Sequence, residues 1–254
     1  MKASKKIMSH TEVELQRLKE EASQMWRLVL SQLEKAKQAF FSGDVELALE
    51  VTGREKTIDA LELKIDNDCE NYIALYSPVA VDLRLVLSLI KISVTLERIG
   101  DFAEGIAFHV IEENGRSMNA QLIEDLQLEK MFDTLINMLS DSFVALESEN
   151  TKISGRIISK DCEVDKLYHS SLGVLTAYLL KNSGDVLAGL KLMLIIRKLE
   201  RIGDHCRNIV EEIVFYVDAK VLKHGGKKKA EAALAHSEKN DTFAQPNQKV
   251  CTTP

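Results

Sequence analysis

Leu96-Glu97-Arg98-Ile99-Gly100-Asp101 is repeated without a change as Leu199-Glu200-Arg201-Ile202-Gly203-Asp204, at an offset of 103 residues in a chain of 254. Further identities follow at the same offset: Asp82 with Asp185, Leu87 with Leu190, Leu89 with Leu192 and Ile106 with Ile209. Self-similarity at one fixed spacing is the signature of a repeated structural unit. The sequence therefore predicts two related halves.

A second, weaker match lies upstream of each LERIGD motif. Residues 55–61 (EKTIDAL) align with residues 161–167 (DCEVDKL) at an offset of 106. The change in offset falls in the connection before the LERIGD segment, which is TyrSerProValAla in the first half and the shorter AsnSerGly in the second. Each repeat therefore includes at least two aligned segments and the turn between them.

Apolar residues recur in steps of three and four along most of the chain, which is the pattern of an amphipathic helix. Turn and cap residues interrupt the pattern at Ser42-Gly43-Asp44, Ser77-Pro78, Asn114-Gly115 and 182–185. The predicted helices cover residues 11–41, 44–76, 79–113, 119–146, 151–181 and 185–223. We expect an all-α fold of six long helices in two pseudo-symmetric three-helix bundles, with repeats over 4–115 and 117–224 and a poorly ordered polar tail over 225–254.

The composition is that of an ordinary soluble protein, with 45% apolar and 28% charged residues. A net charge of −6 argues against a nucleic-acid partner, because such proteins carry basic surfaces. No signal peptide or membrane-spanning segment is recognisable. The four cysteines have no CxxC spacing and suggest reduced thiols, so we expect a cytoplasmic protein that meets a membrane only through partners.

Acidic residues spaced four apart form the most informative pattern after the repeat itself. Two such pairs occur in each half: Glu55/Asp59, Glu97/Asp101, Asp161/Asp165 and Glu200/Asp204. Carboxylates four apart share one helix face and repel each other, so a bound cation would offset their cost. Helical bundles build metal sites from such side chains, and oxygen ligands favour hard cations.

The position of these acids along the helices strengthens the metal hypothesis. Two series continue apolar steps into the carboxylates: Leu83, Leu87, Ile90, Val94, Glu97 and Asp101, and Val186, Leu190, Met193, Arg197, Glu200 and Asp204. We expect these stripes to face the core, where acids must be paired, neutralised or bound to a cation. Gly100 and Gly203, inside predicted helices, suggest the close approach of another helix.

Two alternatives to metal binding remain open from spacing alone. The first is that Arg98 and Arg201, which lie next to the acids, form structural ion pairs with them. The second is chance, since Glu62/Asp66 is a further acidic pair and has no counterpart in the second half.

A metal oxidase or hydrolase would need a histidine ligand, which the motifs lack, and no P-loop, GxSxG or HExxH motif occurs. We therefore do not expect an enzyme.

The doubled LERIGD motif, residues 78–84 (PVAVDLR) and residues 161–167 (DCEVDKL) together resemble the PhoU family of phosphate-signalling proteins over about residues 10–224. The resemblance implies a pair of three-helix bundles. It also implies that the eight acids Glu55, Asp59, Glu97, Asp101, Asp161, Asp165, Glu200 and Asp204 hold divalent or trivalent ions in multinuclear clusters. Iron, manganese, zinc and magnesium are all compatible with this implication.

The same resemblance implies a regulatory role. Its members restrain the phosphate-starvation response and act with the ATPase of the ABC phosphate transporter and with a membrane sensor histidine kinase. A homo-oligomer, in the simplest case a dimer, is expected. The alternatives are an accessory regulator of a low-affinity phosphate permease and a purely structural helical adaptor.

Overall fold

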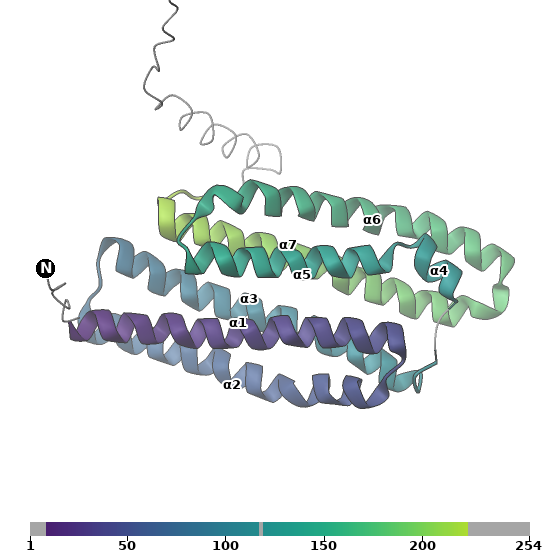
Figure 1. Ribbon diagram of the computed structural model, residues 1–254, viewed down its shortest axis with the longest axis horizontal. Helices are drawn as coiled ribbons and strands as arrows, with labels where there is room; N and C mark the ends of the chain where they lie inside the picture. The colour runs from purple at the N-terminus through teal and green to yellow at the C-terminus, as the bar shows by residue number, and fades with distance from the viewer. Residues whose placement is uncertain (1–8, 117–118, 223–254) are drawn as a thin grey trace, which may run out of the picture.

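The computed structural model describes residues 9–116 and 119–222, and in these ranges the chain is helical without strands (Figure 1). The α-helices are α1 (His10–Ser42), α2 (Val45–Tyr76), α3 (Ala80–Glu112), α4 (Ala120–Asp125), α5 (Leu128–Glu147), α6 (Ser154–Lys181) and α7 (Val186–Asp218). Short 3-10 turns at Thr151–Ile153 and Ser183–Asp185 precede α6 and α7. The all-α prediction is confirmed, and the predicted tail over 225–254 lies outside the described residues.

The predicted ends of the first three helices agree with the structure to within about one residue. Asp44 caps α2, because its carboxylate accepts a hydrogen bond from the backbone N–H of Leu47 at 2.9 Å. Ser77 ends α2 in the left-handed conformation before Pro78, and Gly115 follows α3 with a φ of +70°. These local stops work as the sequence indicated.

The fourth predicted helix, 119–146, is confirmed in its extent but not in its continuity, because the structure divides it into α4 and α5. Gln127 adopts a φ of +51°, which breaks the helix between Leu126 and Leu128. On one continuous helix, two residues spaced two apart would point about 200° apart. The break lets both leucines enter the core, where they are 3% and 0% exposed. Burial of apolar surface thus offsets the local strain at Gln127.

The sixth predicted helix, 185–223, is too long at its C-terminal end. α7 stops at Asp218, since Ala219 takes a left-handed conformation with a φ of +55° and donates its N–H to the carbonyl of Phe215. The Asp218 carboxylate also accepts a hydrogen bond from the hydroxyl of Thr151 at 3.1 Å. The end of α7 is thus tied to a segment 67 residues earlier in the chain, a contact that residue propensities along α7 do not report.

The two halves pack side by side and share one core. In Figure 1, α1, α2 and α3 lie in the lower part of the view and α5, α6 and α7 in the upper part. α1 packs against α5 and α3 against α7, and the cluster of buried apolar residues continues from one half into the other. Trp26 on α1 is fully buried and donates its indole N–H to the carbonyl of Leu139 on α5 at 3.1 Å. The halves are therefore joined by apolar packing and by directed hydrogen bonds.

The expected core-facing stripe on α3 is wrong. Leu87 and Val94 are 36% and 41% exposed, whereas Leu85, Leu89 and Leu96 are buried. α3 is packed by α1 and α2 on one side and by α7 on another, so most of its circumference is apolar and several stripes compete. The stripe that carries the carboxylates lies at the solvent-facing edge of the helix interface, and so does its counterpart on α7, where Leu190 is 58% exposed.

Candidate functional site

Carboxylates from α2 and α3 gather along the edge between these two helices. This first-half acidic cluster consists of the predicted Glu55, Asp59, Glu97 and Asp101 together with Glu62 and Glu104. Asp59 is the common neighbour, since its charge contributes to a raised pKa at Glu55, Glu62, Glu97 and Glu104. The structure thus brings the two predicted pairs of the first half together and adds two further acids.

Glu55 is the most deeply placed member of the cluster, with only 7% of its surface exposed. The side-chain amide of Gln32 donates to its Oε2 at 2.8 Å, while Oε1 is buried and accepts no hydrogen bond from any described residue. Burial raises the pKa of Glu55 from its ordinary value of 4.5 to about 7, and the charges of Asp101 and Glu104 add to the rise.

Gly100 makes room for this buried carboxyl group. A Cβ atom at Gly100 would lie 3.4 Å from both carboxylate oxygens of Glu55 and 3.2 Å from Cδ1 of Ile58. In the second half, a Cβ atom at Gly203 would lie 3.1 Å from Oδ1 of Asp161. The expectation that both glycines allow another helix to approach closely is confirmed, and each places an acid against the backbone of the LERIGD motif.

Positive charge is scarce around the first-half acidic cluster. Arg98 lies 3.4 Å from carboxylate oxygens of both Glu97 and Asp101, but its side chain is 55% exposed, so these ion pairs contribute little. Burial raises the pKa of Glu97 and of Glu104, and Asp101 raises both further, while Arg98 and Lys198 oppose the rise at Glu97 and Glu104 respectively. The cluster keeps an excess of negative charge.

The second half arranges its four predicted acids differently. Asp161 on α6 is 1% exposed, and Nη1 of Arg207 lies 3.1 Å from its Oδ2. Nη2 of the same guanidinium lies 3.0 Å from Oδ1 of Asp204. Burial and the charge of Asp204 raise the pKa of Glu200. Arg207 therefore joins acids of α6 and α7.

The remaining predicted residues of the second half lie at its surface. Asp165 is half-buried on α6, and Arg201 is exposed on α7, where its charge opposes the raised pKa of Glu200. The sequence reasoning passed over Arg207 and Glu104, although an offset of 103 makes them counterparts in the repeat. No sequence signal links Gln32 to Glu55, because α1 meets α2 and α3 only through tertiary packing.

The donor chemistry of the two clusters differs in its fit to a metal ion. Within residues 9–116 and 119–222, no three histidine, cysteine or acidic side chains are already arranged to hold one ion. The first-half acidic cluster offers oxygen ligands only, including the unpaired Oε1 of Glu55, and fits a hard cation once its side chains rotate. Asp161 and Asp204 fit such an ion less well, because the guanidinium of Arg207 already binds them.

Comparisons with known proteins agree with the doubled geometry. The family described as PhoU domain matches residues 22–110 and again residues 128–213. The chain belongs to the PhoU family. The chain is 34% identical to the phosphate-specific transport system accessory protein PhoU homolog of Aquifex aeolicus, over 83% of this chain and 94% of the relative. It is 32% identical to the Escherichia coli protein of the same type, over 91% and 95% of the two chains.

Solved structures give the same result. The crystal structure of PhoU from Pseudomonas aeruginosa superposes with a TM-score of 0.77 and 29% identity, covering 82% of this PhoU-family chain and 99% of that one. The PhoU regulatory protein of Streptococcus pneumoniae gives a TM-score of 0.75 and 27% identity, over 84% and 100%. These printed names describe accessory or regulatory proteins of phosphate transport.

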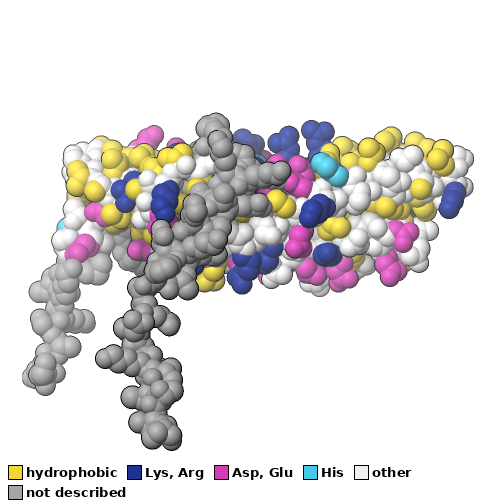
Figure 2. Space-filling model, turned by 90° about the horizontal axis from the view of Figure 1, so that it is seen from above, with side chains coloured by type: hydrophobic (Ala, Val, Ile, Leu, Met, Phe, Trp, Pro, Cys, Tyr) yellow, Lys and Arg dark blue, Asp and Glu magenta, His cyan; other side chains and the backbone are white. Residues whose placement is uncertain are grey.

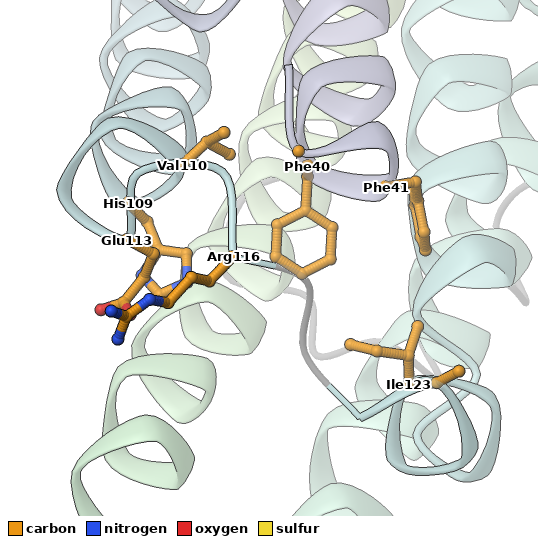
Figure 3. A pocket seen from close by; sticks show the side chains of 9 residues that line it. Phe40, Phe41, His109, Val110, Glu113, Arg116 and Ile123 are labelled. Carbon is orange, nitrogen blue, oxygen red and sulfur yellow. The ribbon is translucent and has the colours of Figure 1, made fainter. Parts of the chain in front are cut away.

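A cavity of about 230 Å³ lies where α1, α3 and α4 of this PhoU-family chain meet (Figure 3). His109, Glu113 and Arg116 lie together on one side of it, and Phe40, Phe41 and Ile123 form the other side. Glu113 is already engaged, since Nζ of Lys191 lies 2.5 Å from its carboxylate. No described lining residue is a serine, threonine or cysteine, so the cavity presents no hydroxyl or thiol nucleophile.

The C-terminal part of α6 and the N-terminal part of α7 expose large apolar side chains, and these two helices extend beyond the others in Figure 1. The side chains are Leu172, Leu180, Val186, Leu187, Leu190 and Leu194, with exposed fractions between 46% and 81%. Hydrophobic side chains also gather at the right-hand end of the view in Figure 2. None of the helices in the described ranges is long and apolar enough to cross a membrane. An exposed apolar surface of this kind is typical of sites that bind another protein or a membrane surface.

Proposed function

We propose that this PhoU-family chain is a negative regulator of phosphate uptake and of the phosphate-starvation response. In this role it acts as an adaptor between the ATPase of the ABC phosphate transporter and a sensor histidine kinase. The observation that carries the proposal is the match over 94% and 95% of the length of relatives named phosphate-specific transport system accessory proteins. Membership of the family gives the coarser role, which is regulation of phosphate transport.

The structure supports an adaptor in two ways. The shared core joins the halves into one elongated helical body, and the end formed by α6 and α7 exposes apolar side chains. We propose that the chain works in the cytoplasm as a homodimer and reaches the membrane only through its partners.

We also propose that the carboxylates bind divalent or trivalent metal ions, with iron, manganese, zinc or magnesium as candidates. The support is the excess of acids over bases around Asp59 and the buried, unpaired Oε1 of Glu55. Such an ion would supply the positive charge that the acids of α2 and α3 lack. The metal would then hold these two helices together at their exposed edge.

The adaptor proposal is tested by affinity purification of the tagged chain from the source bacterium, grown with excess and with limiting phosphate. Mass spectrometry should find the transporter ATPase and a phosphate sensor kinase with the wild-type chain and not with a tagged, unrelated helical protein. Recovery of the bait without either partner in both conditions would overturn the adaptor. Recovery of a low-affinity phosphate permease instead would favour the alternative accessory role.

A further inference from the structure

We propose that the two acidic clusters are unequal: the first binds a hard cation, whereas in the second the guanidinium of Arg207 stands in the place of the cation. This inference rests on the metal-binding part of the proposed function. It assigns Arg207 as an internal counter-ion and restricts metal binding to the edge between α2 and α3.

The position of Arg207 supports this assignment directly. Its guanidinium lies 3.1 Å from the buried carboxylate of Asp161 on α6 and 3.0 Å from Asp204, one turn earlier on α7. A planar guanidinium can donate to two carboxylates at once, which a bare ion would otherwise bridge. The Arg207 side chain is only 23% exposed, so its charge acts on Asp161 with limited screening by water.

The same repeat position holds the opposite charge in the first half. Arg207 corresponds to Glu104 at the offset of 103, and Glu62 has an uncharged counterpart at the offset of 106, Tyr168. The first-half acidic cluster therefore sets six carboxylates against Arg98 and against Lys198 of α7, whose charge acts on Glu104. The second half sets its four predicted acids and Glu211 against Arg197, Arg201 and Arg207.

A second observation distinguishes the clusters independently of the charge count. Glu55 and Asp161 are counterparts in the repeat, and both are more than nine-tenths buried. Asp161 has a guanidinium partner, whereas Oε1 of Glu55 has no hydrogen-bond partner among the described residues and faces Gly100. A buried carboxylate without a counter-charge needs a proton or a cation, so only the first half has an unmet requirement.

An ion entering the second half would have to displace Arg207 from Asp161 and Asp204. The displaced guanidinium would lose its charge-assisted hydrogen bond to Asp161 and its ion pair with Asp204, and only its partial exposure would let water replace them. In the first half, an ion meets only the exposed Arg98 and, beside Glu104, Lys198 among the described residues, and neither of them is paired with the buried Glu55. The predicted difference in cation affinity between the two clusters follows from this competition.

The test counts Mn²⁺ ions bound to the full chain by electron paramagnetic resonance and measures their affinity by calorimetry. Two matched double variants remove one acid from each helix of one cluster: Asp59→Asn with Asp101→Asn, and Asp165→Asn with Asp204→Asn. We expect the first double variant to abolish Mn²⁺ binding and the second to leave it unchanged. Equal losses in the two variants would overturn the inequality while leaving metal binding intact.

Substitutions that change the charge of Arg207 and of its repeat counterpart Glu104 test the role of Arg207. Arg207→Gln should increase the number of bound Mn²⁺ ions about twofold, whereas Arg156→Gln, which removes an exposed arginine paired with Asp141, should not change it. Glu104→Arg should weaken binding in the first half by at least about tenfold, and it remains informative if Arg207→Gln does not fold. Wild-type affinity in Glu104→Arg would overturn the counter-ion mechanism. Absence of Mn²⁺ binding in the wild type and in Arg207→Gln would overturn metal binding itself and leave the adaptor proposal to its own experiment.

Discussion

The buried carboxyl group of Glu55 should make the folded protein lose stability as the pH rises from about 5 to about 8. Its pKa is about 7 in the folded protein, against an ordinary value of 4.5 in an unfolded chain. Between these two values the folded state holds a proton that the unfolded state has released. Each increase in pH therefore favours unfolding, and the effect ends once the pH is above the folded pKa.

The size of this effect follows from the separation of the two pKa values. At about 1.36 kcal/mol per pH unit, a rise from 4.5 to about 7 corresponds to roughly 3 kcal/mol of unfolding free energy. Part of this loss is already complete at pH 5, so the change between pH 5 and pH 8 is about 2–3 kcal/mol. Glu55→Gln removes the ionisation and keeps an acceptor for the amide of Gln32, so it should remove this pH dependence.

Urea unfolding followed by circular dichroism, with a chelator present, measures this difference. The quantity compared is the unfolding free energy of Glu55→Gln minus that of the wild type. We expect this difference to be about 2–3 kcal/mol larger at pH 8 than at pH 5. Glu70→Gln is the matched control, since Glu70 is exposed on the same helix, and it should show no such change. If Glu55→Gln and the wild type differ by the same amount at both pH values, the argument from burial is refuted. Adding Mn²⁺ at pH 8 should stabilise the wild type more than Glu55→Gln.

Three further predictions concern the fold. Trp26→Phe should lower the unfolding free energy by about 2 kcal/mol in urea titrations, because it removes buried volume and the hydrogen bond between the halves. Gly43→Ala should cost at least about 2 kcal/mol in the same assay, since φ is +69° and the new Cβ would meet a carbonyl oxygen of the turn after α3. Burial raises the pKa of Cys69 and Cys206, so iodoacetamide should label Cys162 before either of them, as read by mass spectrometry.

Each of these predictions has a contradicting outcome. Gly53→Ala is the control for Gly43→Ala, because nothing lies within 4 Å of a Cβ added at Gly53. This variant should leave the unfolding free energy unchanged or raise it by up to about 1 kcal/mol. A loss at Gly53 as large as at Gly43 would show that the close approach of the turns is unimportant. Labelling of Cys206 at the rate of Cys162 in the native protein would contradict its burial, and an unchanged stability of Trp26→Phe would contradict the described contact between the halves.

Local signals along the chain determined the helices and the repeat. Asp44 caps a helix through a neighbour three residues away, and Ser77 before Pro78 leaves the α conformation for steric reasons that need no distant contact. The spacing of Glu97 and Asp101 likewise puts both on one helix face whatever the helix packs against. These features are readable from the sequence because their causes lie within one or two turns.

Only the tertiary structure decided which acids meet and how they are neutralised. Arg207 reaches Asp161 across 46 residues of sequence, and Gln32 reaches Glu55 from a third helix, so neither contact has a local signal. The break at Gln127 and the exposed stripe at Leu87 also depend on which competing apolar faces find partners. The sequence determined the carboxylate pairs and their twofold repetition. Packing determined that the second cluster has an arginine, Arg207, paired with its buried acid, whereas the arginine of the first cluster, Arg98, is exposed and pairs only with acids of its own helix. Burial and charge pairing depend on neighbours that only the folded chain brings together.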